Sequence, residues 1–160
     1  MSDNEMSFDD LSAFVPGAVG PAGQRVFYLQ ARRNASAMSI RCEKQHVAAL
    51  AEYFGHELDG PSSPLTNPDL VEFSEPDRHE MVAGSLGVGH DEANERFVVV
   101  LHAIEGEEDA DGERVRFSID AAMARAFVSV AEGLLTSGRP PCPFCEAPMD
   151  PAGHACPRMN

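Results

Sequence analysis

The chain is short of positive charge. Its 160 residues include 12 lysines and arginines against 26 aspartates and glutamates, which gives a formal net charge of −14 at pH 7. The basic residues are also scattered, and only Arg32 and Arg33 are adjacent. Proteins bind nucleic acids and anionic membrane surfaces through several lysine or arginine contacts. The composition therefore predicts a protein that binds neither nucleic acid nor membranes.

A long hydrophobic run is also missing. No apolar stretch approaches the roughly 18 residues of a membrane span. The start of the chain, Met1-Ser-Asp-Asn-Glu5, has neither the basic end nor the apolar segment of a secretion signal. We therefore expect a cytoplasmic protein, in which cysteines stay reduced or bind metal rather than form disulfides. Cys42 lies in an apolar segment far from the other three cysteines, and we expect it to be a buried small hydrophobic residue.

The other three cysteines stand close together near the end of the chain, with a histidine among them. The pattern is Cys142-x2-Cys145-x8-His154-x-Cys156. Four nitrogen and sulfur ligands suit tetrahedral zinc in a structural site, and they leave no open position for hydrolytic chemistry. The spacing therefore predicts one structural Zn²⁺. An iron–sulfur centre, another metal or a chance grouping of cysteines are the alternatives.

The sequence before this tail reads as two similar halves. Three apolar segments and one amphipathic helix follow one another in the same order in each half. The matched segments are 14–20 with 81–87, 26–31 with 98–103, 38–42 with 115–119, and 43–58 with 120–136. Period-2 alternation in the third segments and a 3.6-residue apolar stripe in the helices support these assignments. The stripe of the first helix consists of Val47, Leu50, Ala51, Phe54 and Leu58, and that of the second helix of Met123, Phe127, Val130 and Leu134. The pattern predicts a duplicated β-β-β-α unit.

The expected domain boundaries follow from this pattern. We expect an acidic N-terminal extension over residues 1–13, a duplicated domain over 14–137 and a zinc-binding tail over 138–160. Within the domain, the first unit covers about 14–58, a proline- and serine-rich linker 59–77, and the second unit about 78–137. The predicted fold is α+β, with one mixed or antiparallel sheet, both helices on one face, and a short zinc knuckle after the second helix.

No catalytic residue is predicted. The chain has no nucleophile elbow, no histidine-based metalloprotease motif and no kinase motif set. The sheet face opposite the helices is expected to be open and to carry Arg41, His102 and Arg116, which could pair with an anionic small molecule. The alternative is a solvent-edge histidine beside two ordinary surface arginines.

Four segments together resemble a known family. They are the tail segments 139–145 and 149–160, the strand segment 27–32 and the helical segment 43–52. They resemble an uncharacterised actinobacterial family of duplicated proteins of unknown function that carry a C-terminal Cys3His metal motif. The resemblance covers nearly the whole chain from about Phe14. It implies a bacterial cytoplasmic protein with a metal-binding C-terminus, and it implies no activity.

These observations favour a non-enzymatic, zinc-binding adaptor or regulatory protein that acts through protein–protein contacts. The strongly acidic composition suits a basic protein partner. The alternative is a small enzyme or ligand sensor that binds an anionic small molecule on the open sheet face through Arg41 and Arg116.

Overall fold

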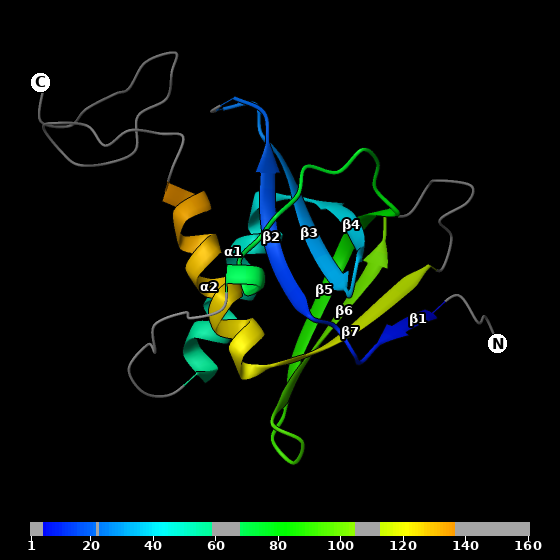
Figure 1. Ribbon diagram of the computed structural model, residues 1–160, viewed down its shortest axis with the longest axis vertical. Helices are drawn as coiled ribbons and strands as arrows, with labels where there is room; N and C mark the ends of the chain where they lie inside the picture. The colour runs from blue at the N-terminus through cyan, green and yellow to red at the C-terminus, as the bar shows by residue number, and fades with distance from the viewer. Residues whose placement is uncertain (1–4, 22, 59–67, 105–112, 137–160) are drawn as a thin grey trace, which may run out of the picture.

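The computed structural model describes residues 5–21, 23–58, 68–104 and 113–136 (Figure 1). The described strands are β1 (Glu5–Phe8), β2 (Ala13–Val19), β3 (Val26–Arg33), β4 (Ser36–Cys42), β5 (Met81–Asp91), β6 (Arg96–Ala103) and β7 (Arg114–Asp120). The helices are α1 (Lys44–Glu57) and α2 (Ala121–Thr136), and a short 3₁₀ turn, η1, spans Pro68–Leu70. No helix in these ranges is long and apolar enough to cross a membrane.

The seven strands form one mixed sheet in the order β1-β7-β6-β5-β4-β3-β2. Neighbouring strands are antiparallel except at two places: β1 pairs with β7 and β4 pairs with β5 in parallel. Both helices lie on the same side of the curled sheet, and α2 runs beside the edge strand β2 (Figure 1). The α+β class with a mixed sheet and two helices is therefore confirmed.

The two halves share the order strand-strand-strand-helix, but their ladders differ in register. Gly17 lies opposite Tyr28 in the first half. Gly84, which the sequence matches to Gly17, falls at an irregularity of the β5–β6 ladder. Val100, which the sequence matches to Tyr28, lies opposite Gly87 instead. The residue-by-residue matching is therefore not kept in the second ladder, and the duplication of the whole unit stays a prediction.

The core lies between the concave face of the sheet and the two helices. Leu50 of α1 and Phe127 of α2 are fully buried there, as the helical stripes predicted. The buried face of α2 differs from its predicted stripe, because Val130 and Leu134 are only half-buried. Three alanines are buried in their place: Ala124, Ala126 and Ala131. Such small side chains allow α2 to lie close to its neighbours, β2 and α1.

Side chains at the helix starts explain where the helices begin. Asp120 precedes α2 and its Oδ1 accepts a hydrogen bond from the backbone N–H of Met123, at 2.9 Å. Before α1, the backbone N–H of Glu43 donates to Nδ1 of His46, at 3.0 Å. With Nδ1 accepting, Nε2 of His46 carries the proton and donates to the carbonyl of Gly84, at 3.2 Å. His46 thus joins the start of α1 to the irregular part of β5.

Residues 71–80 form a strap across the sheet face opposite the helices (Figure 1, green trace between η1 and β5). The strap is held by Gln30, whose side chain points away from the core and is only 2% exposed. Nε2 of Gln30 donates to the carbonyl of Ser74 at 2.8 Å, and its Oε1 accepts from the N–H of Ser74 at 3.0 Å. Nη1 of Arg32 also pairs with Glu72, at 3.3 Å. A buried amide needs such partners.

The strap includes residues 71–77 of the predicted linker, and its Phe73 and Ser74 contact the outer face of the sheet. The expectation that the face opposite the helices is open is wrong over β2 and β3, because Phe73 covers Gly17 and lies beside Tyr28 with ring centroids 6.4 Å apart.

The N-terminal residues are also part of the fold. Residues 5–8, which we expected in an acidic extension, form the edge strand β1. Residues 9–12 then connect β1, at one edge of the sheet, to β2 at the other edge. Asp9 pairs with Arg116 at 3.3 Å, and Asp10 pairs with Arg33 at 2.9 Å. These ion pairs fasten the crossing to β7 and β3. The four residues of β1 are too few to show the alternation by which a strand is recognised in a sequence.

Replacing Gly17 by alanine tests the contact between the strap and the sheet. An added Cβ would overlap the ring of Phe73. We expect the free energy of unfolding to fall by about 1–3 kcal/mol, as for other overpacked sites. Gly87→Ala is the matched control, since a Cβ on this strand glycine meets nothing within 4 Å. Urea unfolding of both variants measures the difference, and equal losses would contradict the packed strap.

Candidate functional site

The four predicted zinc ligands, Cys142, Cys145, His154 and Cys156, lie outside the described residues. Within the described ranges, no group of three or more histidine, cysteine, aspartate or glutamate side chains is placed to hold a metal ion. The zinc site therefore stays a prediction from the sequence.

Cys42 is the cysteine that the described ranges contain, and it is a core residue. It is 4% exposed and belongs to the main hydrophobic cluster. Burial raises the pKa of its thiol from the usual 9.0 to about 12, and the negative charge of Glu43 adds to the effect. A thiol that stays protonated is a poor nucleophile and a poor metal ligand. The expectation of a buried small hydrophobic residue is confirmed.

The predicted ligand face does not bring its three residues together. Arg41, His102 and Arg116 stand on β4, β6 and β7, and each points to the side of the sheet away from the helices. Strands β5 and β6 lie between β4 and β7. At roughly 4.8 Å per strand, the two arginines therefore stand about 14 Å apart measured along the sheet. Arg116 is also engaged by Asp9.

His102 lines a shallow hollow of its own. Its neighbours there are Gly84, Ser85, Ala103 and Ile104. Neither Arg41 nor Arg116 contributes to this hollow. The sequence placed the three residues on the correct side of their strands, but alternation gives no information about strand order or about distance along the sheet.

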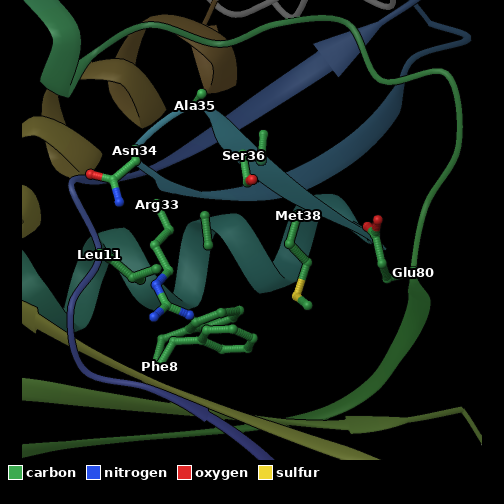
Figure 2. A pocket seen from close by; sticks show the side chains of 11 residues that line it. Phe8, Leu11, Arg33, Asn34, Ala35, Ser36, Met38 and Glu80 are labelled. Carbon is green, nitrogen blue, oxygen red and sulfur yellow. The ribbon is translucent and has the colours of Figure 1, made fainter.

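A larger cavity lies at the end of the curled sheet where β3 turns into β4 (Figure 2). We call it the hairpin hollow. Its volume is about 570 Å³. It is lined by Phe8, Leu11, Ala31, Arg33, Asn34, Ala35, Ser36, Ala37, Met38, Glu80 and Phe117. The hairpin forms one wall and Phe8 of β1 lies opposite it, with α1 behind (Figure 2).

The floor of the hairpin hollow is apolar. Phe8 and Phe117 stack there, with ring centroids 5.7 Å apart and ring planes at 27°. Met38 is half-buried beside them, and Leu11 and Ala31 are buried. The hollow is thus an uncovered continuation of the hydrophobic core.

Charged groups stand at the rim of the hairpin hollow. Arg33 extends from the end of β3 toward Phe8 (Figure 2). Its Nε lies 2.9 Å from Oδ2 of Asp10, with which it forms an ion pair. Across the hollow, Oε2 of Glu80 accepts a hydrogen bond from the backbone N–H of Ser39, at 2.8 Å. The hollow therefore combines an apolar floor with one cation and one anion at separate points of its rim.

The sequence analysis did not identify Arg33 as a candidate binding residue, although the alternation of β3 indicates its position. Leu29 and Ala31 alternate toward the core of β3, and the same period places Arg33 on the core side. Arg32 points to the other face, where it holds the strap. Arg33 thus stands on the core side of the sheet, at the mouth of the cavity.

A family comparison covers almost the whole chain. The matching family model spans residues 6–156 and is described as a protein of unknown function (DUF3090). The chain belongs to this family. No curated protein and no solved structure matches the chain. The matched DUF3090 region runs from β1 to Cys156, so it includes both the sheet and the predicted zinc ligands. The expected membership of an uncharacterised family is confirmed at this level.

The raised pKa of Cys42 predicts a loss of stability in alkali. The folded state keeps its proton up to about pH 12, whereas the unfolded thiol loses it near pH 9. The contribution of this thiol to the free energy of unfolding is therefore fully present below about pH 9. It is lost between about pH 9 and about 12, by at most about 1.4 kcal/mol per pH unit. Urea unfolding at several pH values should show a steeper fall for the wild type than for Cys42→Val. Cys145→Ser, which keeps Cys42, should follow the wild type. Identical slopes for the wild type and Cys42→Val would contradict a buried, protonated thiol.

Proposed function

We propose that this DUF3090 protein is a non-enzymatic, zinc-binding adaptor or regulatory protein that acts in the cytoplasm through contacts with other proteins. The observation that carries the proposal is the grouping of three cysteines and one histidine directly after the domain. Cys142, Cys145, His154 and Cys156 supply four soft ligands within fifteen residues. A closed site of this kind fixes a short segment into a rigid surface.

Three candidate catalytic groups of the described domain, Cys42, His46 and His90, are held in structural positions. The thiol of Cys42 is buried and protonated. His46 is held by two backbone groups at the start of α1. His90 stacks on Phe97 with centroids 4.5 Å apart, and its Nδ1 lies 3.6 Å from Glu57. The thiol is thus enclosed in the core, and the two histidines have structural partners, whereas general acid–base or nucleophilic catalysis needs such groups to face a substrate.

The charge of the chain favours a basic protein as the partner. A formal net charge of −14 attracts basic surfaces and repels polyanions. The alternative that we considered, an anionic ligand shared by Arg41 and Arg116, loses its geometric basis because two strands separate these residues. The adaptor function is therefore the one we propose.

Metal analysis of the full chain tests the zinc site. Protein purified without added metal should contain about one equivalent of zinc per chain. Cys145→Ser should lose most of it, because three ligands bind a structural zinc ion much more weakly than four. Cys42→Ala is the matched control and should keep the metal. Equal zinc content in the wild type and Cys145→Ser would contradict the predicted ligands.

Crosslinking in native cytoplasm, followed by reconstitution, tests the adaptor function. The wild type and Cys42→Ala should capture the same protein, and Cys145→Ser should lose it. The captured protein, once purified, should bind zinc-loaded wild type directly. Turnover of a small molecule by the purified chain alone, or partner binding that does not depend on zinc, would overturn the proposal.

A further inference from the structure

Arg33 presents a free guanidinium edge to an apolar cavity. Its Nε is used by Asp10, at 2.9 Å. Within the described part of the chain, Arg33 makes no other ion pair, and its two terminal amino groups donate no hydrogen bond. The neighbouring Arg32 differs, because its Nη1 pairs with Glu72 and its Nη2 donates to Ser74 and Gln30. Two terminal guanidinium nitrogens are the donors with which arginine binds a carboxylate, sulfonate or phosphate.

The cavity beneath Arg33 suits an apolar body. The stacked rings of Phe8 and Phe117 form its floor, and Leu11 and Met38 lie beside them. Its volume of about 570 Å³ is within the usual range for small-molecule sites, roughly 300–1,000 Å³. The side chains of Arg33 and Met38 point from the hairpin into this space, toward Phe8 (Figure 2).

The geometry points to the hairpin hollow as a binding site for a small amphipathic monoanion. Arg33 binds the acidic head, and the apolar body lies on Phe8, Met38 and Phe117. Glu80 stands at another point of the rim and repels a second negative group there. The site therefore selects one acidic head over two. The net charge of −14 does not prevent this, because charges beyond about 8 Å are largely screened at physiological ionic strength.

This site is separate from the proposed adaptor function. The described residues that line the hollow include neither Arg41 nor Arg116, although β4 and β7 both contribute to it. The proposal uses none of the four predicted zinc ligands. A basic peptide segment is the competing occupant, but the guanidinium of Arg33 repels it at the mouth. Loss of zinc through Cys145→Ser should therefore leave ligand binding in the hollow unchanged, so the two proposals fail independently.

Titration of the full-length, ¹⁵N-labelled protein with decanoate, below its micelle-forming concentration, tests the proposal. Decanoate combines one carboxylate with an apolar chain. We expect saturable shifts in Phe8, Phe117 and the hairpin residues 31–38. Arg33→Gln should weaken binding by roughly tenfold or more, because a charge-assisted hydrogen bond is lost. Arg41→Gln, which removes an exposed arginine outside the hollow, is the matched control and should bind like the wild type.

Two further variants test the proposal through effects other than weaker decanoate binding. Asp10→Asn removes the carboxylate that competes for Arg33 and should tighten decanoate binding by roughly twofold to fivefold. Decanedioate, with an acid at each end, should bind more weakly than decanoate, and Glu80→Gln should reduce the difference.

Three results would overturn the proposal. They are the absence of saturable shifts with decanoate, equal binding by Arg33→Gln and Arg41→Gln, and shifts located away from the hairpin. Tight binding of a lysine-rich apolar peptide in the hollow, unaffected by Arg33→Gln, would also overturn it in favour of a peptide site.

Discussion

The fold depends on a contact between two phenylalanines from opposite ends of the sheet. Phe14 stands on the edge strand β2, and Phe117 stands on β7, next to the other edge. Their ring centroids are nevertheless 5.3 Å apart, and Phe14 also stacks on Phe127 of α2 at 5.4 Å. A flat seven-stranded sheet would hold β2 and β7 roughly 24 Å apart. The sheet must therefore curl until its two ends meet over a shared aromatic core.

This curl explains the other features of the molecule. It brings the two edges close enough for residues 9–12 to cross between them, where Asp9 and Asp10 pair with Arg116 and Arg33. It leaves a gap at the end of the sheet where β3 turns into β4. There the rings of Phe8 and Phe117 form the floor of a cavity rather than pack against a helix. On the face away from the helices, the strap lies over β2 and β3. The site that we propose for a small ligand thus lies on the curled sheet, whereas the predicted zinc ligands follow the sheet and helices in the sequence.

The local sequence pattern predicted the strands and helices but not how they are arranged relative to one another. Alternation and helical stripes located the strands and helices of both halves and the burial of Leu50 and Phe127, because these depend on nearby residues. The four-residue β1 was missed because it is too short to alternate. The strap was missed because Gln30 gives no sign in the sequence that it is buried. The supposed grouping of Arg41 with Arg116 failed because strand order is a long-range property. The four predicted zinc ligands are a different case. Their spacing in the sequence is the only indication of them, and they lie outside the described residues.

A double-mutant cycle between Phe14 and Phe117 tests most directly that the two ends of the sheet meet. Unfolding free energies are measured for Phe14→Leu, Phe117→Leu and the double variant. A direct ring contact predicts a coupling energy of about 0.5–1.5 kcal/mol, so the double variant loses less than the sum of the two single losses. Losses that add to within about 0.3 kcal/mol would place the rings apart and would contradict the curled sheet.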